Sequence, residues 1–346
     1  MWKGKELNSL MRDEAAASAD CVAAQLCADE EKYYELGVKL SLHEPSAVVT
    51  VARGSSDHAA SFFSYLSMSR GGQAVSSLPM SLVTLYNAPL TTRGVLAVSI
   101  SQSGRSPDLK APIDLYRSGG GTTVALVNDP ASPLASAAQW MFPLHAGAER
   151  SVAATKSFIC SLLASVRLVA HWRDDASLLH GVRGLPNALR DACTQDWSAG
   201  VEALRDAQRI MVIGRGAGLA IAQEAALKFK ETCGIQAEAF SAAEVKHGPM
   251  ALVDQGYPML IFAPRGPAQA GVLALADEMR GRGARVILAA PSDVPSRTLT
   301  MTTCGSADLD PITAIQSFYL MVEELARARG YDPDKPPHLN KVTATL

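Results

Sequence analysis

"AVVTVARGSS" (residues 47–56) and "RIMVIGRGAG" (209–218) have the same layout: an apolar run, then Arg-Gly, then small residues that open a helix. The likeness continues downstream, because "VLAVSISQSG" (95–104) corresponds to "YPMLIFAPRG" (257–266). Val127 follows Arg53 by 74 positions, and Ala289, in a similar apolar run, follows Arg215 by the same 74 positions. The chain therefore contains an internal repeat.

Around both copies, short apolar runs alternate with helical stretches, which predicts an α/β fold with a parallel sheet and helices on both faces. "QWMFPL" (139–144) and "RTLTMTT" (297–303) are expected to add a fourth strand to each sheet. We expect residues 1–190 to form charged, alanine-rich N-terminal helices and a first domain. Residues 195–330 are expected to form a second domain. Residues 331–346 are proline-rich and predict an extended tail.

Composition and charge argue against several classes of function. Of 346 residues, 48% are apolar and 19% charged, which suffices for a sizeable core. A net charge of −2 without a Lys/Arg cluster argues against a nucleic-acid partner. The six scattered cysteines suggest reduced thiols in a cytoplasmic protein. The apolar stretch 157–172 is interrupted by Arg167 and is too short to span a bilayer, so no membrane partner is expected.

Hydroxyl groups gather where two predicted strands end. Ser101, Ser103, Gly104 and Ser106 follow one strand, and Gly54, Ser55 and Ser56 follow another. Open α/β sheets bind ligands at this edge, and the free N–H groups of a helix start favour phosphate. The alternative is that Ser106 only caps a helix starting at Pro107 and that the others only form turns. Asp108 would have to point away from a bound dianion.

A dinucleotide site is the rival ligand class. In "VIGRGAGLA" (212–220) the third glycine of the expected G-x-G-x-x-G pattern is replaced by Leu219. The acidic residue expected near the next strand end is also missing. We therefore expect no NAD.

A helix is predicted from about 219 to 232, ending at Gly234. Lys228 and Glu231 share one face of it, and Glu224 is expected to belong to a charge ladder on the surface. Glu231 lies in the last turn, where the helix dipole disfavours a carboxylate and favours a general base.

The segment after this helix, "IQAEAFSAAEVKHGPMALV" (235–253), contains a second candidate. Ser241 and Glu244 match a capping box, so a short helix is expected to start there. Gly248 and Pro249 would end it and leave His247 at its end. A histidine in such a place is either catalytic or simply solvated.

Taken together, "SQSGRSPD" (101–108), "ALKFKET" (226–232), "AEAFSAAEVKHGPMALV" (237–253) and "HLNKVT" (338–343) resemble the sugar isomerase (SIS) domains of glucosamine-6-phosphate synthase. The resemblance covers nearly the whole chain. It implies two tandem SIS domains, each a flavodoxin-like sandwich with about five parallel strands. We expect no glutaminase domain to precede these motifs, and stand-alone chains of this type resemble glucosamine-6-phosphate deaminases.

The resemblance also implies roles. Glu231 would move a proton between C2 and C1, His247 would open the sugar ring from across a homodimer interface, and Lys341 would reach the sugar carbonyl. Lys228 lies on the glutamate helix. No metal or redox cofactor is implied. The substrate and its phosphate would contact Gly54, Ser55, Ser56, Ser101, Gln102, Ser103, Ser106, Val152 and Ala153.

Two alternatives stay open from the sequence. The pocket could instead act on a fructosamine 6-phosphate or catalyse a plain aldose–ketose isomerisation, because the residues that contact the amine are not identifiable. Arg105 replaces an acid of the synthase, which weakens any transfer of synthase specificity. A sensor that binds a sugar phosphate without turnover would keep the serines and could dispense with Glu231, His247 and Lys341.

Overall fold

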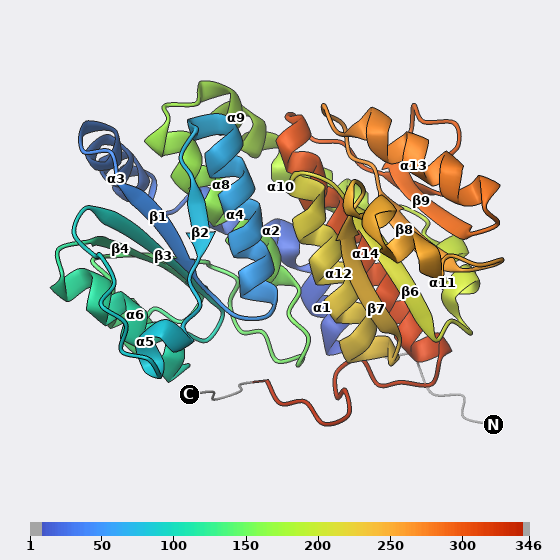
Figure 1. The fold of residues 1–346 in the computed structure, drawn as a ribbon, viewed down its shortest axis with the longest axis horizontal. Helices are drawn as coiled ribbons and strands as arrows, with labels where there is room; N and C mark the ends of the chain where they lie inside the picture. Colours follow the sequence, from blue (N-terminus) through green and yellow to red (C-terminus); the bar gives the residue numbers. More distant parts are fainter. Residues whose placement is uncertain (1–8, 342–346) are drawn as a thin grey trace.

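The structure, a computed structural model, describes residues 9–341, so residues 1–8 and 342–346 of the predicted N-terminal helices and tail lie outside it. The described residues form two five-stranded parallel sheets, side by side in Figure 1. The first has the order β2-β1-β3-β4-β5 and the second β10-β9-β8-β6-β7. Counted from its own first strand, each sheet has the doubly wound order 2-1-3-4-5. The predicted α/β repeat is confirmed.

The strands coincide with the apolar runs of the sequence. Every residue of Val95–Ser101 is buried, as expected for a central parallel strand covered on both faces. The two runs predicted as additional strands are present as Trp140–Pro143 and Leu299–Met301. The strands are β1 Ala47–Val51, β2 Val75–Ser77, β3 Val95–Ser101, β4 Thr122–Val127, β5 Trp140–Pro143, β6 Arg209–Gly214, β7 Gln236–Ser241, β8 Pro258–Phe262, β9 Arg285–Pro291 and β10 Leu299–Met301.

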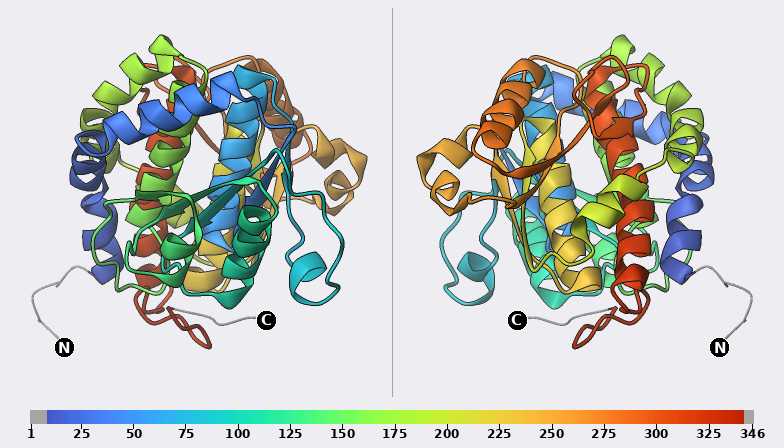
Figure 2. Two further views of the ribbon diagram at one scale, coloured as in Figure 1. Left: turned by 90° about the vertical axis from the view of Figure 1, so that its left-hand side faces the viewer. Right: turned by 90° about the vertical axis from the view of Figure 1, so that its right-hand side faces the viewer.

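Helices cover both sheets, and one layer between the sheets joins the two repeats (Figures 1 and 2). In this layer α4 packs against α8 and α12, and α12 packs against α14. The helices are α1 Leu10–Ala16, α2 Ser18–Leu26, α3 Glu30–Leu42, α4 Ser55–Gly71, α5 Ser81–Thr84, α6 Pro107–Ser118, α7 Pro133–Ala137, α8 Lys156–Trp172, α9 Ala176–Gly181, α10 Leu185–Cys193, α11 Ser198–Leu204, α12 Ala217–Cys233, α13 Gln269–Gly281 and α14 Asp310–Ala328.

The core runs through this shared layer. Phe62 of α4, Phe229 of α12 and Phe318 of α14 are fully buried in one hydrophobic cluster that includes residues of both repeats. The rings of Phe229 and Phe318 meet edge to face, with centroids 5.2 Å apart. This shared core fixes the position of one sheet relative to the other. It therefore also fixes α4 relative to α12, and both helices reach the site described below.

Two local predictions need correction or refinement. Ser241 is the last residue of β7 rather than a helix cap, and the short helix after it is a 3₁₀ turn, η2 Glu244–His247, that begins after Ala243. A second 3₁₀ turn, η3 Pro249–Leu252, follows Gly248. The strand pairing of β7 with β6 extends through Ser241, so its backbone is not available to start a helix. The long helix α12 ends before Gly234, which has a left-handed φ of 62°, as predicted.

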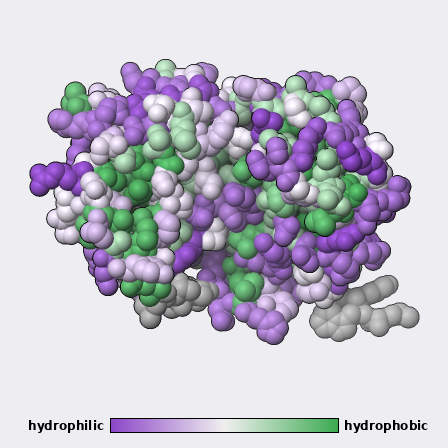
Figure 3. Space-filling model, in the orientation of Figure 1, coloured by the Kyte–Doolittle hydropathy of each residue, from purple (hydrophilic) through white to green (hydrophobic). Residues whose placement is uncertain are grey.

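Polar and apolar residues are interspersed over the face seen in Figure 3. None of the helices between residues 9 and 341 has the length and apolar character needed to cross a membrane.

Candidate functional site

The carboxyl ends of β1 and β3 open into a cavity of about 350 Å³. This is the switch point of the doubly wound order, where such sheets bind ligands. Its lining comes from the loops after β1 and β3, from α12 and from the C-terminal tail: Arg53, Gly54, Ser56, Ile100, Ser101, Gln102, Ser103, Ser106, Leu109, Val152, Glu231, Leu339, Asn340 and Lys341.

Two helices begin at this cavity. Gly54 precedes α4 with a φ of 53°, a conformation that other residues rarely adopt, and α6 begins with Pro107 after Ser106. The first N–H groups of each helix have no partner within that helix, and the helix dipole adds positive potential. The hydroxyls of Ser56 and Ser106 lie at these starts. The arrangement is suited to an anion such as a phosphate.

Two of the serines also have a structural role, because they form hydrogen bonds within the loop after β3. Ser101 Oγ accepts a hydrogen bond from Gly104 N at 2.9 Å, and Ser103 Oγ accepts a long one from Arg105 N at 3.4 Å. These bonds shape the loop after β3. Because each hydroxyl acts there as acceptor, its own hydrogen is still available to a ligand.

Asp108 does not face the cavity. Its side chain is fully buried and accepts a hydrogen bond from Arg53 Nε at 3.0 Å. The acid in the first turn of α6 is thereby paired with a cation, which removes the conflict with a bound dianion. Arg53 was not among the predicted site residues.

A charged cluster lies behind the cavity on α12. Lys228 Nζ donates to Ser55 Oγ at 3.1 Å, forms an ion pair with Glu224 Oε1 at 3.3 Å and contacts Glu231 Oε2. Lys228 is almost completely buried, whereas the side chain of Glu231 is 20% exposed at the cavity. Lys228 therefore connects the start of α4 with the carboxylate of Glu231.

Glu224 is not part of a surface ladder, and that prediction was wrong. It is fully buried because α4 and α14 cover this face of α12. Tyr319 donates its hydroxyl to Glu224 Oε1 at 3.1 Å, and His58 Nδ1 lies 2.9 Å from Oε2. Burial alone would raise the pKa of Glu224, but Lys228 and His58 together hold it below its ordinary value.

The same network fixes the charge of Lys228. Burial disfavours the ammonium form, yet the carboxylates of Glu224 and Glu231 more than offset this and raise the pKa of Lys228 to about 12. Lys228 is therefore an ammonium ion at neutral pH, with its protons directed at Ser55 and the two carboxylates.

The C-terminal tail is held at the cavity by one ion pair. Lys341 Nζ lies 3.0 Å from Glu149 Oε2, and Glu149 is buried. Glu149 also accepts hydrogen bonds from Thr155 N at 3.0 Å, from Ser157 N at 3.1 Å and from Ser157 Oγ at 2.6 Å. Glu149 thus fixes both the turn before α8 and the position of Lys341.

This ion pair predicts a pH dependence. Burial would raise the pKa of Glu149, but Lys341 and the Ser157 hydroxyl lower it below its ordinary value. A lowered pKa means that the stabilisation is complete above about pH 4.5 and is lost as the pH falls through the lowered value. Glu149→Gln should reduce the free energy of unfolding at pH 7 by about 1–3 kcal/mol, and its deficit relative to wild type should shrink on acidification.

Urea unfolding at a series of pH values measures this difference. Glu35→Gln, at an exposed position of α3, is the matched control and should unfold as wild type does at each pH. A deficit of Glu149→Gln that is constant from pH 7 to pH 3.5 would contradict the assignment.

The structure does not bring His247 to this cavity. His247 lies on the exposed η2 turn, whose neighbour Lys246 pairs with Glu278 of α13. Ala153 is also absent from the lining, because its side chain is buried in the core. Val152 of the same turn does line it.

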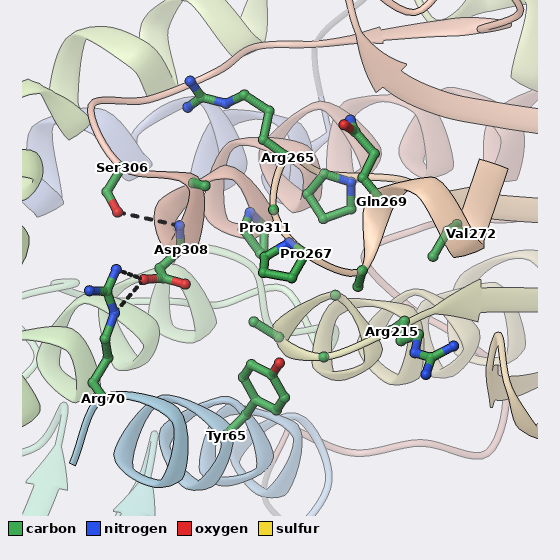
Figure 4. Close-up of a pocket in the computed structure, with 17 residues that line it drawn as sticks. Tyr65, Arg70, Arg215, Arg265, Pro267, Gln269, Val272, Ser306, Asp308 and Pro311 are labelled. Atoms are coloured by element: carbon green, nitrogen blue, oxygen red, sulfur yellow. Dashed lines mark hydrogen bonds and ion pairs between the residues drawn. The ribbon is translucent and has the colours of Figure 1, made fainter. Parts of the chain in front are cut away.

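The corresponding place in the second sheet has the same backbone but different side chains. Gly216 precedes α12 with φ 62° and ψ −136°, close to the 53° and −132° of Gly54. Figure 4 shows that Tyr65 and Arg70 reach this pocket from α4. A Cβ on Gly216 would lie 2.8 Å from the Tyr65 hydroxyl, whereas the space at Gly54 is open. The four serines that line the first cavity have no counterpart here. The positions that correspond to Ser56, Ser101, Ser103 and Ser106 are Gly218, Ala263, Arg265 and Ala268.

Comparison with known proteins accounts for the doubled sheet. The sequence profile of the SIS domain family matches residues 41–171 and 203–293. The chain belongs to the SIS domain family. The two matched segments are the two repeats, so the cavity lies in the first SIS domain and is reached by α12 of the second.

Curated relatives are about one third identical to this chain over the aligned residues. Glutamine–fructose-6-phosphate aminotransferase (isomerizing) of Zymomonas mobilis is 34% identical over 274 residues, which are 74% of this chain and 45% of that protein. The enzyme of the same name from Aeropyrum pernix is 37% identical over 265 residues, which are 71% of this chain and 43% of that protein. The chain thus spans about half the length of the curated relatives it matches.

Solved structures have the same overall fold. A presumed phosphosugar isomerase from Silicibacter pomeroyi superposes with a TM-score of 0.89 at 40% identity, covering 94% of this chain and all of the other. Glucosamine-6-phosphate deaminase from Thermotoga maritima shares the fold, with a TM-score of 0.72 at 21% identity over 94% of this chain and all of the other.

Most of the predicted site residues therefore converge on the cavity at the edge of the first sheet. Ser55 and Lys228 lie directly behind the cavity, and His247 and Ala153 do not reach it. Between residues 9 and 341, no group of three His, Cys, Asp or Glu side chains could hold a metal ion. The predicted residues that line the cavity are Gly54, Ser56, Ser101, Gln102, Ser103, Ser106, Val152, Glu231 and Lys341.

Proposed function

We propose that this chain is an aminosugar-phosphate deaminase that converts glucosamine 6-phosphate to fructose 6-phosphate and ammonia. One observation carries the proposal: the carboxylate of Glu231 lines the same cavity as the hydroxyls and the two helix starts that suit a phosphate. A sugar anchored by its phosphate at one end can then present C1 and C2 to Glu231 at the other.

The reaction needs one base that moves a proton. In the open-chain sugar, the C1 aldehyde makes the C2 proton acidic, and Glu231 removes it. Glu231 then returns the proton to C1, and a proton passes from the amine nitrogen to the C1 oxygen, which leaves a hydroxymethyl group at C1 and an imine at C2. Water adds to C2 and ammonia departs, giving the ketose phosphate. Lys228 contacts the Glu231 carboxylate and so orients it toward the cavity.

The relatives support this class of chemistry. The curated relatives are named as isomerizing aminotransferases of fructose 6-phosphate, and the part that they share with this chain comprises the two SIS domains. We infer that a chain of this kind acting without glutamine runs toward release of ammonia. Cytoplasmic location and dimerisation belong to the same proposal.

An apolar groove favours a second candidate substrate. About 490 Å³ in volume, it shares Glu231 and Leu339 with the phosphate cavity and is otherwise lined by Leu227, Lys230, Gly234, Tyr331 and Pro337. A substituent on the amine could bury apolar surface there. The alternative is therefore a fructosamine 6-phosphate whose amine carries an apolar group.

A substrate panel separates these candidates. Initial rates would be measured without glutamine for glucosamine 6-phosphate, galactosamine 6-phosphate and an N-alkyl fructosamine 6-phosphate, with the ketose or aldose phosphate and the released amine both quantified. We expect glucosamine 6-phosphate to have the largest kcat/KM. A larger kcat/KM for the N-alkyl compound would replace the deaminase by the second candidate.

Because His247 is exposed and distant from the cavity lining, we propose that it opens the sugar ring in the site of a partner subunit. His247→Asn and Glu231→Gln should each be inactive alone. Mixed after dissociation and reassociation, they should recover about a quarter of wild-type activity, because half of the dimers are mixed and each has one intact site. Wild-type activity in His247→Asn, or no recovery in the mixture, would contradict the shared site.

A further inference from the structure

Arg53 occupies a place in the cavity that the hydroxyl groups alone do not explain. It lies two residues after the end of β1, precedes the first turn of α4 and lines the cavity together with Ser101, Ser103 and Ser106. Its side chain is 56% exposed, whereas its partner Asp108 is fully buried behind it. The guanidinium is therefore held between a buried carboxylate and the open cavity.

The ion pair with Asp108 fixes the orientation of this guanidinium. The bond of 3.0 Å uses Nε, so the two Nη groups are not needed for it. Arginine presents its donors in a planar fork that matches the oxygens of a phosphate. Anchoring by Nε lowers the entropy that the side chain loses when a ligand binds.

The two lysines near the cavity use their single nitrogen in ion pairs, whereas Arg53 pairs through Nε and has two further nitrogens. Lys341 pairs with Glu149, which is buried, and Lys228 lies behind the cavity with two carboxylates, Glu224 and Glu231. Among the residues that line the cavity within 9–341, Arg53 is the cation beside the hydroxyls.

The internal repeat supplies an independent comparison. Arg215 follows β6 as Arg53 follows β1, but Ala270 occupies the position that corresponds to Asp108. The second repeat also lacks the serines that line the cavity of the first. The acid that holds the arginine thus occurs in the domain that has the hydroxyls and not in the other, as expected if both serve one ligand.

We propose that Arg53, oriented by Asp108, binds the phosphate of the substrate and selects dianionic phosphate monoesters over uncharged sugars. This rests on the proposed function for the identity of the sugar, but the ligand chemistry, a phosphate dianion, stands apart from it. The serines and helix starts supply neutral donors, and Arg53 supplies the positive charge that a dianion favours.

Arg53→Gln tests this against Arg215→Gln as the matched control. The dissociation constants of inorganic phosphate and of fructose 6-phosphate would be measured by calorimetry, together with KM and kcat for ammonia release from glucosamine 6-phosphate. Arg53→Gln should raise both dissociation constants and KM by about 10- to 100-fold, since a charged hydrogen bond is lost. The value of kcat should stay within about threefold of wild type, because the proposal places Arg53 at the phosphate and Glu231 at the reacting carbons. Arg215→Gln should bind as wild type does.

Two other results are informative. Equal dissociation constants for Arg53→Gln and Arg215→Gln would overturn the role of Arg53, whatever the enzyme turns over. Absence of ammonia release from wild type, with phosphate binding still weakened by Arg53→Gln, would reject the proposed function and leave the role of Arg53 intact. Should Arg53→Gln unfold at a lower temperature, Arg53→Lys, which keeps the charge, should fold normally and bind phosphate more tightly than Arg53→Gln; equal weakness in both would count against the proposal.

Discussion

Replacing Glu231 by Gln is expected to reduce kcat for ammonia release by about 10³-fold and to leave substrate binding within about threefold of wild type. The amide has nearly the same size and can still accept a hydrogen bond from Lys228, but it cannot accept the C2 proton. The groups that we propose to bind the phosphate lie on other elements, after β1 and β3, so they should not be disturbed.

Glu238→Gln is the matched control, because Glu238 is exposed on β7, seven residues further along the chain. It should show wild-type kcat. Calorimetric titration with fructose 6-phosphate would show that Glu231→Gln still binds. Full activity of Glu231→Gln would remove this residue from the mechanism, and loss of both binding and activity would indicate a structural role instead.

The second large effect is on stability. Lys228→Met is expected to lower the free energy of unfolding by about 3–5 kcal/mol, because it leaves Glu224 fully buried without its cation. Lys230 lies two residues further along, on the exposed face of α12. Lys230→Met should lower the free energy of unfolding by less than about 0.5 kcal/mol. The double variant Glu224→Gln/Lys228→Met should regain part of the loss, since the uncompensated charge is gone.

The sign of the pH dependence follows from the raised pKa of Lys228. Its stabilisation is complete below its ordinary value of 10.5 and is lost as the pH rises through about 12. The deficit of Lys228→Met should therefore be constant from pH 7 to pH 10. Urea unfolding that gives additive single and double effects would show that Glu224 and Lys228 do not interact.

The sequence predicted the fold well because the repeat imposes the same pattern twice. Residues near one strand end, such as Ser101 and Ser106, could be placed together because parallel strands align their carboxyl ends at one edge. The short helix predicted from Ser241 and Glu244 failed for a local reason: pairing of β7 with β6 continues through Ser241 and competes with capping.

The residues that were missed or misread depend on contacts between distant segments. Glu224 resembled a surface charge because it lies one turn from Lys228, in line with Glu231 on the same helix. Its actual partners are remote in sequence: His58 lies 166 positions away and Tyr319 lies 95 positions away. Glu149 meets Lys341 across 192 positions. No periodicity or spacing encodes such pairs, since they arise only when α4, α12, α14 and the tail pack together. Glu149 stood three residues before Val152 in a turn already singled out, which was the one available signal.

The most direct test is to incubate wild type and Glu231→Gln with glucosamine 6-phosphate in the absence of glutamine, and to quantify ammonia and fructose 6-phosphate in the same samples. The account predicts equal amounts of both products from wild type and almost none from Glu231→Gln. Wild-type protein that binds the sugar phosphate but releases neither product, or a variant that releases both at the wild-type rate, would contradict it.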